Sequence, residues 1–358
     1  MNNWLLYGAY GYTGRLIIEE AVQRGHKPVL AGRNKDKLIP LAKLYDLGWL
    51  ELGLDDGDKL ATAVAPFDLV FHAAGPFTIT SDPMLRACLA GKTHYVDITG
   101  EIGVFENTFH YDEAARQNNL VFISGVGFDV VPSDCLANYV ADKLPDATEL
   151  ELAIAALGSA SAGTTNTMLE LLPTLKKGSV VRRNGRYQSH SIGQDAKQVT
   201  FSNGRTRTVT PLPWGDLATA YRSTGIPNIT TYMILPVSPT MARFFRLYRP
   251  LLAIKPVRRL AQTIVARNVT GPDETARQTG RSYLYARATN QRGTAVEAWL
   301  ETMEGYQLTA VAGVRAVEKI LNGETTAGTL TPAQAFGVDF VLEIEGTKRF
   351  DKLPKIIS

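Results

Sequence analysis

The stretch MNNWLLYGAYGYTG, residues 1–14, decides the fold. A short apolar run, 4–7, leads directly into three evenly spaced glycines: Gly8, Gly11 and Gly14. A helical pattern follows over 15–23 and stops at Gly25. Strand, glycine turn and helix in this order indicate a dinucleotide-binding site, because the glycines allow a sharp turn and a close approach of phosphate to the helix N-terminus. The Gly-x-x-Gly-x-x-Gly spacing is not the commonest fingerprint, so a glycine-rich turn without a ligand stays open as the alternative.

The residues of this turn that we expect to contact a dinucleotide are Gly8, Tyr10, Gly11, Tyr12, Thr13 and Gly14. The end of the next strand indicates which dinucleotide. An apolar run over 28–31 ends in Gly32, Arg33 and Asn34, where an NAD site has an acidic residue and an NADP site has an arginine for the 2′-phosphate. Lys37 adds a second positive charge. The pattern favours NADP, and the alternative is an ordinary solvated arginine at a strand end.

Composition bounds the class of protein. The chain has 358 residues, enough for two domains and a large core. A net charge of +3 argues against a general nucleic-acid binder. No run of about eighteen apolar residues predicts a membrane span, and the chain enters a strand too early for a signal peptide. The two isolated cysteines, Cys88 and Cys135, are typical of a reduced cytoplasmic protein. The five histidines lack ligand spacing, so no metal site is predicted.

Residues 1–131 alternate strand and helix patterns, which predicts a doubly wound, Rossmann-like parallel sheet of the α/β class. The predicted strands are 4–8, 28–32, 49–54, 69–74, 95–99 and 121–124, and the predicted helices include 15–23, 83–90 and 112–117. Their apolar runs imply burial on both faces of the sheet. We assign 1–131 to a dinucleotide-binding domain.

Residues 132–358 have a different sequence pattern and are predicted to form a second, α+β substrate domain. Its C-terminal tail can pack back on the first domain. Helices are expected over 133–144, 164–175 and 308–321, a strand over 149–157, antiparallel strands within 178–236, and a hairpin from 282–289 and 294–302. A catalytic cleft between the two domains is the natural consequence.

One segment, 243–267, carries seven basic residues and no acid, interleaved with apolar side chains. It could be an amphipathic lid that contacts a membrane surface or an acyl carrier. The favoured interpretation is a pair of helices with one buried face and one solvated basic face.

Five first-domain motifs occur in a characteristic order: YGAYGYTGRL (7–16), AGRNKDKL (31–38), HAAGPF (72–77), THYVDITGE (93–101) and GVGFDVVPSD (125–134). Two later blocks, WGDLATAYRSTGIPN (214–228) and LTPAQAFG (330–337), extend the pattern. The chain thereby resembles saccharopine dehydrogenase-like proteins, a group that includes trans-acting enoyl reductases. The resemblance implies a Rossmann-like domain with an α+β domain and an NADP-dependent oxidoreductase, and it leaves the substrate open.

Further cofactor contacts are expected where the predicted strands end, because those ends border the ligand crevice. These residues are Asp55, Ala74, Gly75, Pro76, Phe77, Asp97, Gly127 and Phe128. Thr99 and Glu101 are further hydrogen-bonding candidates. For each of them a turn-capping role is the alternative, and it is the expected one for Asp97 and Asp129.

A proton donor is expected from the second domain, where Trp214 precedes the predicted catalytic residues Asp216, Tyr221 and Arg222. Tyr221 could protonate the substrate, and Arg222 could hold a carboxylate or thioester carbonyl. The alternative is a pair of core aromatics beside a surface ion pair. Tyr139 and Lys143 have the Tyr-x-x-x-Lys spacing of short-chain dehydrogenases, a less favoured interpretation.

Two reactions and one non-catalytic role compete. Reduction of an unsaturated acyl chain would use 244–264 as a channel wall, whereas saccharopine-type amino acid chemistry would need cations such as Arg205, Arg207 and Arg222. A regulatory protein that senses NADP is the third reading. The expected partners are NADPH, a small-molecule or acyl substrate and a second copy of the chain in a homodimer.

Overall fold

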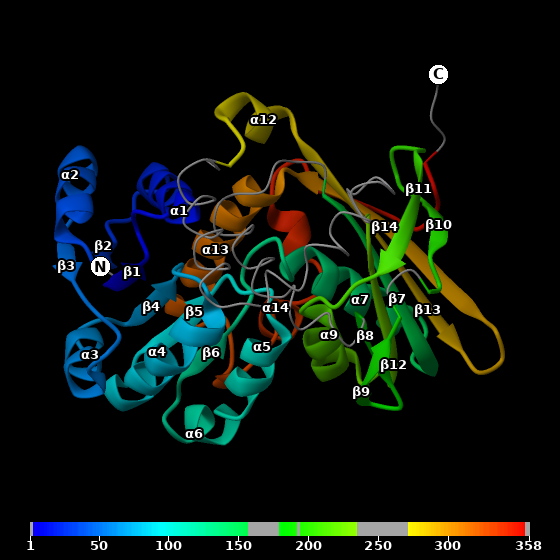
Figure 1. Ribbon diagram of the computed structural model, residues 1–358, viewed down its shortest axis with the longest axis horizontal. Coiled ribbons are helices and arrows are strands. Elements are labelled where there is room, and N and C mark those ends of the chain that lie inside the picture. Colours follow the sequence, from blue (N-terminus) through cyan, green and yellow to red (C-terminus); the bar gives the residue numbers. More distant parts are fainter. Residues whose placement is uncertain (1–2, 157–178, 192–193, 235–270, 355–358) are drawn as a thin grey trace, which may run out of the picture.

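The computed structural model describes residues 3–156, 179–191, 194–234 and 271–354. The predicted helix over 164–175 and the basic segment 243–267 lie outside these residues. The described chain builds two sheets that lie next to each other, the first formed mainly by the N-terminal third and the second by the middle and C-terminal parts (Figure 1).

The first sheet is the predicted parallel, doubly wound sheet. Its seven strands have the order β15-β6-β5-β4-β1-β2-β3, and all neighbours are parallel. The strands are β1 (Trp4–Tyr7), β2 (Val29–Gly32), β3 (Trp49–Glu51), β4 (Leu69–His72), β5 (His94–Asp97), β6 (Val121–Ile123) and β15 (Gly328–Thr329). The order reverses between β1 and β4, which places a ligand crevice beyond the carboxyl ends of these two strands.

Helices cover both faces of this sheet, as the apolar strands predicted. Leu6 and Phe71 belong to one core layer, and Leu5 and Val70 belong to the other, because successive strand residues point to opposite faces. The first layer contains α1 (Tyr12–Gln23), α2 (Lys35–Tyr45) and α13 (Gly305–Leu321). The second contains α3 (Gly57–Val64), α4 (Phe77–Gly91) and α6 (Asp112–Gln117).

The start of α4 differs from the prediction. The helix begins at Phe77 rather than at Pro83, which lies inside it. The reason is a distant carboxylate: Glu101, at the N-cap of α5 (Ile102–Phe109), accepts the amides of Phe77 at 3.3 Å and Thr78 at 2.8 Å. This capping from another element stabilises the first turn of α4, which the local sequence does not predict.

The second sheet is mixed and has nine strands within the described residues. They are β7 (Ala147–Ala156), β8 (Ser179–Arg183), β9 (Arg186–His190), β10 (Lys197–Thr200), β11 (Thr206–Pro211), β12 (Asn228–Met233), β13 (Arg281–Asn290), β14 (Ala295–Met303) and β16 (Lys348–Phe350). Helix α7 (Val131–Lys143) covers one face. The predicted hairpin is confirmed as β13 and β14. The region 178–236 is antiparallel only in part, because β12 runs parallel to β7 and a helix, α9 (Asp216–Thr224), interrupts the strands.

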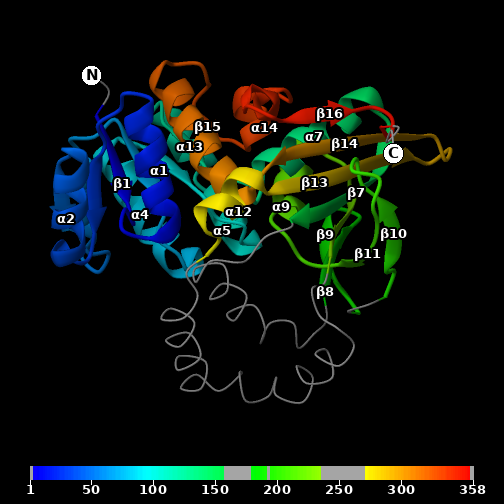
Figure 2. The ribbon, with the colours of Figure 1, turned by 90° about the horizontal axis from the view of Figure 1, so that it is seen from above.

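The chain returns to the first sheet after β14. Helix α13 packs against α1 and β4, and β15 adds the seventh strand beside β6 (Figure 2). Gly313 permits the close approach, since a Cβ there would lie 2.5 Å from the ring of Phe71. After α14 (Pro332–Phe336) and a 3-10 turn (Phe340–Glu343), β16 returns to the second sheet. The first sheet is therefore completed by residues that follow the second domain.

Candidate active site

The glycine-rich turn follows β1 at the carboxyl edge of the first sheet. Gly8 has a φ of 88°, and a Cβ there would lie 2.8 Å from the backbone of Ala73. A Cβ at Gly14 would collide with the carbonyl oxygen of Gly8, so the turn can close only with glycine at both positions. Within the described residues no side chain caps the start of α1 at Gly11, which leaves its first amides, including that of Thr13, available to an anion. This cradle fits the pyrophosphate of a dinucleotide.

The end of β2 carries the cations predicted to recognise a 2′-phosphate. Arg33 and Lys37 are exposed, and the Lys37 Nζ lies 5.5 Å from the centre of the Tyr10 ring. That ring packs on Gly32, where a Cβ would come within 2.6 Å of it. Asn34 instead accepts the Lys37 amide at 3.2 Å and caps α2. The structure thus brings Tyr10, Arg33 and Lys37 to one strand end and gives Asn34 a helix-capping role.

The turn after β4 lies beside the glycine turn, because β4 and β1 are neighbours. A Cβ on Gly8 would also touch Ala74, so the two turns are in contact. Gly75 and Pro76 lead from there into α4, and the Phe77 ring is buried against the sheet. Asp55 is exposed in the loop after β3. The predicted residues 74–77 therefore form one wall at the carboxyl edge.

Asp97, at the end of β5, is a structural hub. Its buried carboxylate accepts the hydroxyls of Tyr95 and Ser124 at 2.8 Å each, and the amides of Thr99 at 2.9 Å and Gly125 at 3.0 Å. Burial raises the pKa of Asp97, although these four hydrogen bonds favour the carboxylate. Its acceptor sites are occupied by protein groups, which favours the structural alternative over the predicted cofactor contact.

Two neighbouring carboxylates, Glu101 after β5 and Asp129 after β6, lie at this edge of the sheet. The Asp129 carboxylate lies against Gly100, where a Cβ would come 2.8 Å from Oδ2. Among the described residues it has no hydrogen-bond partner. Burial, and then the charge of the neighbouring Glu101, raise the pKa of Asp129 to about 7. A carboxyl group that is half protonated near neutral pH is suited to proton transfer.

The sequence analysis expected a structural role for Asp129 and did not foresee this environment. The only signal was its place after a predicted strand, shared with many turn aspartates. Asp129 differs from other turn aspartates through a tertiary contact. Trp214, from the second domain, covers its backbone and donates Nε1–H to the Asp129 carbonyl at 2.7 Å. Burial of this kind cannot be read from the surrounding sequence.

Three predicted cofactor residues make contacts with the C-terminal part of the chain. The Tyr12 hydroxyl donates to the Pro272 carbonyl at 2.6 Å. The Phe128 amide donates to Thr309 Oγ1 at 3.0 Å, and Gly127 leaves room for the same side chain, since a Cβ there would lie 2.7 Å from it. These residues attach the carboxyl edge of the first sheet to α13 and to the segment before α12 (Glu274–Thr279).

The structure does not bring the predicted catalytic residues together. Asp216 is fully buried, neither of its carboxylate oxygens accepts a hydrogen bond of normal geometry from the described residues, and burial raises its pKa well above the ordinary value. The Tyr221 ring instead lies over the Arg182 guanidinium, 4.1 Å from ring centre to Cζ. Arg222 forms an ion pair with Asp112 at 2.9 Å. Each of the three side chains has a different environment, so they do not form one proton-donor cluster.

The short-chain dehydrogenase interpretation is also not supported by the geometry. The Tyr139 hydroxyl and the Lys143 ammonium both donate to Asp351 at 2.7 Å. This cluster lies on α7 of the second domain, covered by the C-terminal segment, and not at the carboxyl edge of the first sheet.

Other functional classes can be examined over the described ranges alone. Within them, no group of three or more His, Cys, Asp or Glu side chains could hold a metal ion. No helix in those ranges is long and apolar enough to cross a membrane. Cys88 and Cys135 are buried free thiols whose pKa values burial raises. The cytoplasmic location and the homodimer stay predictions.

A doubly wound sheet with this glycine turn and a basic strand end is typical of dinucleotide-binding folds. Residues 4–123 match the family model described as the saccharopine dehydrogenase NADP binding domain, so this part of the chain is similar to that domain. The resemblance expected from the sequence motifs is confirmed.

Relatives and a solved structure agree with this. The saccharopine dehydrogenase-like oxidoreductase of Bos taurus is 27% identical over 160 residues, 39% of this chain and 37% of that protein. The trans-acting enoyl reductase of Mycobacterium tuberculosis (strain ATCC 25618 / H37Rv) is 30% identical over 138 residues, 36% of this chain and 33% of that protein. The matched part thus spans less than half the length of these curated relatives.

The apo saccharopine dehydrogenase (L-Glu forming) of Saccharomyces cerevisiae has the same fold, with a TM-score of 0.65 at 13% identity, covering 98% of this chain and 100% of that one. At that identity the likeness concerns the fold alone. Together the comparisons show that the N-terminal part of the chain is similar to saccharopine dehydrogenase NADP-binding domains and to oxidoreductases named after them, and they leave the substrate open.

Proposed function

We propose that the protein is an NADPH-dependent reductase of an unsaturated acyl substrate. The observation that carries the proposal is the pairing of an uncapped α1 N-terminus behind Gly8 and Gly14 with the exposed Arg33 and Lys37 one strand away. The first feature suits a pyrophosphate, and the second suits the additional phosphate that separates NADP from NAD.

When bound, the cofactor supplies a hydride, and the protein supplies orientation and a proton. The amides at the start of α1 hold the pyrophosphate, and Arg33 with Lys37 holds the 2′-phosphate. Ala74, Gly75 and Pro76 form the adjoining wall of the crevice. Asp129 gives the proton from its carboxyl oxygen to the substrate carbon that does not receive the hydride, and it becomes a carboxylate.

Glu101 acts through Asp129. It is fixed by the amides of Phe77 and Thr78, and its negative charge helps to keep the Asp129 proton in place near neutral pH. It is a positioning residue for the acid in this scheme.

An acyl substrate is favoured over a dicarboxylate amino acid because the cations considered for the latter do not converge. Arg205 and Arg207 belong to the hairpin of β10 and β11 at one end of the second sheet, whereas Arg222 is bound to Asp112 of α6. Saccharopine-type amino acid chemistry stays the second candidate, supported by the family of the NADP-binding domain.

The first experiment is a fluorescence titration with NADPH and NADH of wild type and Arg33→Ala. We expect wild type to prefer NADPH, and the substitution to weaken NADPH binding by roughly tenfold or more, the value of one charge-assisted phosphate contact, with little effect on NADH. Lys43→Ala, at an exposed cation of the same domain, is the control. Equal affinities for the two nucleotides, or an Arg33→Ala variant that binds like wild type, would refute the NADP assignment.

The second experiment measures NADPH oxidation with short enoyl thioesters. Asp129→Asn should keep NADPH affinity and lose most of its turnover. The wild-type rate should decline as pH rises through about 7, where Asp129 loses its proton. Burial is the larger cause of this raised pKa and the Glu101 charge the smaller one, so Glu101→Gln should make the decline begin at a somewhat lower pH. An Asp129→Asn variant with wild-type turnover contradicts the assignment, and tight NADPH binding without any turnover favours the NADP-sensing role.

A further inference from the structure

One buried polar side chain at the carboxyl edge of the first sheet has no part in the proposed reaction. His72 is the last residue of β4, and it is fully buried. Three aromatic rings pack on its imidazole edge to face, those of Tyr7, Phe77 and Tyr95, with ring centres 5.4, 5.3 and 6.1 Å away. Burial lowers the pKa of His72 to about 3, so the ring is neutral near pH 7 and carries a single proton.

The partners of the two ring nitrogens decide where that proton lies. His72 Nε2 is 3.2 Å from the carbonyl oxygen of Ala74, which can only accept. Nδ1 is 3.2 Å from the hydroxyl of Tyr95, which donates to the Asp97 carboxylate at 2.8 Å. With the proton on Nδ1, two acceptors would face each other at Ala74. With the proton on Nε2, each contact has a donor, because the hydroxyl proton of Tyr95 then lies between two acceptors. His72 is therefore the Nε2–H tautomer and donates to Ala74.

This hydrogen bond turns the Ala74 carbonyl toward the interior of the domain. The carbonyl also accepts the Thr80 hydroxyl, from α4, at 2.7 Å, but that single hydroxyl proton is within 3.1 Å of the Pro76 carbonyl as well. The Ala74–Gly75 peptide bond is trans, so its C=O and N–H point in opposite directions. The Gly75 N–H therefore points away from the interior. Gly75 is exposed, and no described residue accepts its N–H.

We propose that His72 is a positioning residue for the dinucleotide: it holds the Ala74–Gly75 peptide so that the Gly75 N–H is a fixed donor in the wall of the crevice. The inference rests on the proposed function, because the acceptor is an oxygen atom of bound NADPH. The wall lies against the glycine turn, since a Cβ on Gly8 would come 2.9 Å from the Cβ of Ala74. A donor whose direction is fixed before the nucleotide arrives lowers the ordering cost of binding. His72 acts through the peptide and does not touch the nucleotide.

The tautomer is tested first, on the full chain without nucleotide, by ¹⁵N NMR of the histidine rings. The signals of His72 are those that disappear in His72→Gln. We expect a protonated Nε2 and an unprotonated Nδ1 that do not change between pH 5 and pH 8. A proton on Nδ1, or a ring protonated at both nitrogens at pH 7, overturns the proposal. Because this measurement needs neither NADPH nor turnover, its failure is distinguishable from failure of the proposed function.

The positioning is tested next, by NADPH titration followed through fluorescence and through the amide signal of Gly75. In wild type we expect that signal to shift on saturation. His72→Leu removes the donor to Ala74, so it should weaken NADPH binding by about tenfold, the value of one hydrogen bond, and abolish the shift. His72→Gln retains a side-chain N–H and should recover part of both. Cys88→Ala, at a buried residue of α4, is the matched control for a general loss of stability and should bind NADPH like wild type.

Unchanged NADPH affinity in His72→Leu, or an equal loss in Cys88→Ala, overturns the positioning role. If His72→Leu does not fold, Thr80→Val, which removes the second donor to Ala74, should still weaken NADPH binding by a smaller factor, and no effect there overturns the role. A wild-type protein that binds no NADPH refutes the proposed function and the positioning role together, whereas the tautomer of His72 is decided by the first measurement alone.

Discussion

At the scale of single residues, three buried or partly buried aspartates show how environment decides role. Within the part of the chain that the structure describes, Asp97 is surrounded by four donors, whereas the carboxylates of Asp129 and Asp216 accept no hydrogen bond, and Asp129 lies beside a glutamate. The first is suited to hold a strand end, the second to exchange a proton, and the third to remain neutral inside the protein. The amino acid sequence does not distinguish them.

Replacement of Asp97 by Asn should destabilise the fold. One of the two carboxylate oxygens becomes an NH₂ group, so the donors that face it lose their acceptor. We expect the free energy of unfolding to fall by about 2–4 kcal/mol, measured by urea denaturation. Asp55→Asn, at an exposed loop residue, should change it little. Equal effects of the two substitutions would contradict the structural role of Asp97.

The ionisation of Asp129 should also make the stability of the protein depend on pH. Its pKa is raised from 3.8 to about 7 in the folded protein, so ionisation costs stability progressively as pH rises from about 4 to 7. Asp129→Asn cannot ionise. It should therefore raise the thermal midpoint relative to wild type at pH 8 and have little effect at pH 4. If the difference between the two midpoints did not depend on pH, the pKa of Asp129 would not be raised in the folded protein.

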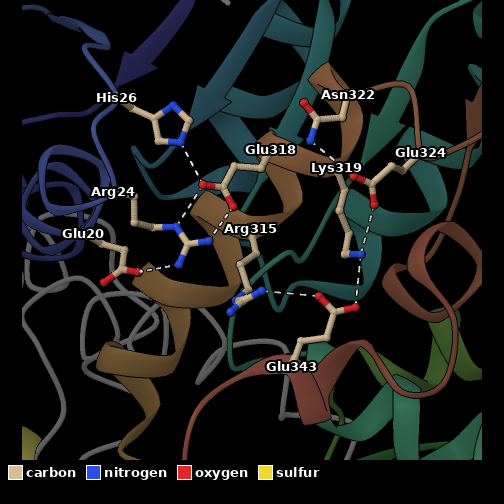
Figure 3. A network of polar contacts seen from close by, with 9 residues as sticks. All are labelled: Glu20, Arg24, His26, Arg315, Glu318, Lys319, Asn322, Glu324 and Glu343. Carbon is tan, nitrogen blue, oxygen red and sulfur yellow. Dashed lines mark hydrogen bonds and ion pairs between the residues drawn. The ribbon is translucent and has the colours of Figure 1, made fainter.

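At the scale of elements, a polar network joins α1 to α13 (Figure 3). The Glu318 carboxylate accepts Arg24 Nε at 2.9 Å and Nη2 at 2.6 Å, and it contacts His26 Nε2 at 2.8 Å. The next residue, Lys319, pairs with Glu343 of the 3-10 turn at 3.1 Å. The contacts of Glu318 link segments that are nearly three hundred residues apart in the chain, and they help to fix how α13 lies on the first sheet.

Glu318→Gln should loosen this junction. Burial raises the pKa of Glu318, but the hydrogen bonds from Arg24 and His26 more than offset it, and the net shift is downward. The ion pair therefore stabilises the protein above the ordinary glutamate pKa of 4.5 and is lost as pH falls below it. We expect a loss of about 1–2 kcal/mol at pH 7 that shrinks toward pH 3, measured by denaturant unfolding across pH. A loss of the same size at pH 3 would point to packing instead.

The elements that sequence predicted correctly share a physical property. Apart from the exposed β3, the first six strands are apolar on both faces, and they end in glycine or polar turns, so their positions follow from local pattern. The first turn of α4 and all of α9 were missed because their signals are distant: Glu101 caps the one, and the buried Phe105 and Val130 pack on Ala218 of the other. The site divides in the same way. The glycine turn and Arg33 are local features, whereas the proximity of Asp129 to Glu101 depends on the fold.

At the scale of the whole molecule, the first domain depends on the end of the chain. Phe71 and Trp4 lie in the core layer that α13 closes, and β15 covers the edge of β6. A fragment of residues 1–131 should therefore lack cooperative unfolding and be digested rapidly by protease. Addition of 304–336 through a flexible linker should restore a cooperative transition, monitored by near-ultraviolet circular dichroism. A fragment that is cooperative without this addition would contradict the dependence.

The return of the chain through α13 and β15 also has a consequence for biosynthesis. During translation the strands β1 to β6 leave the ribosome first, but the helix that covers Phe71 follows only after the second domain has been made. For that period an apolar face stays exposed on the nascent chain. We therefore expect chaperones that hold nascent chains to bind this face during synthesis and to release it once α13 and β15 have been made.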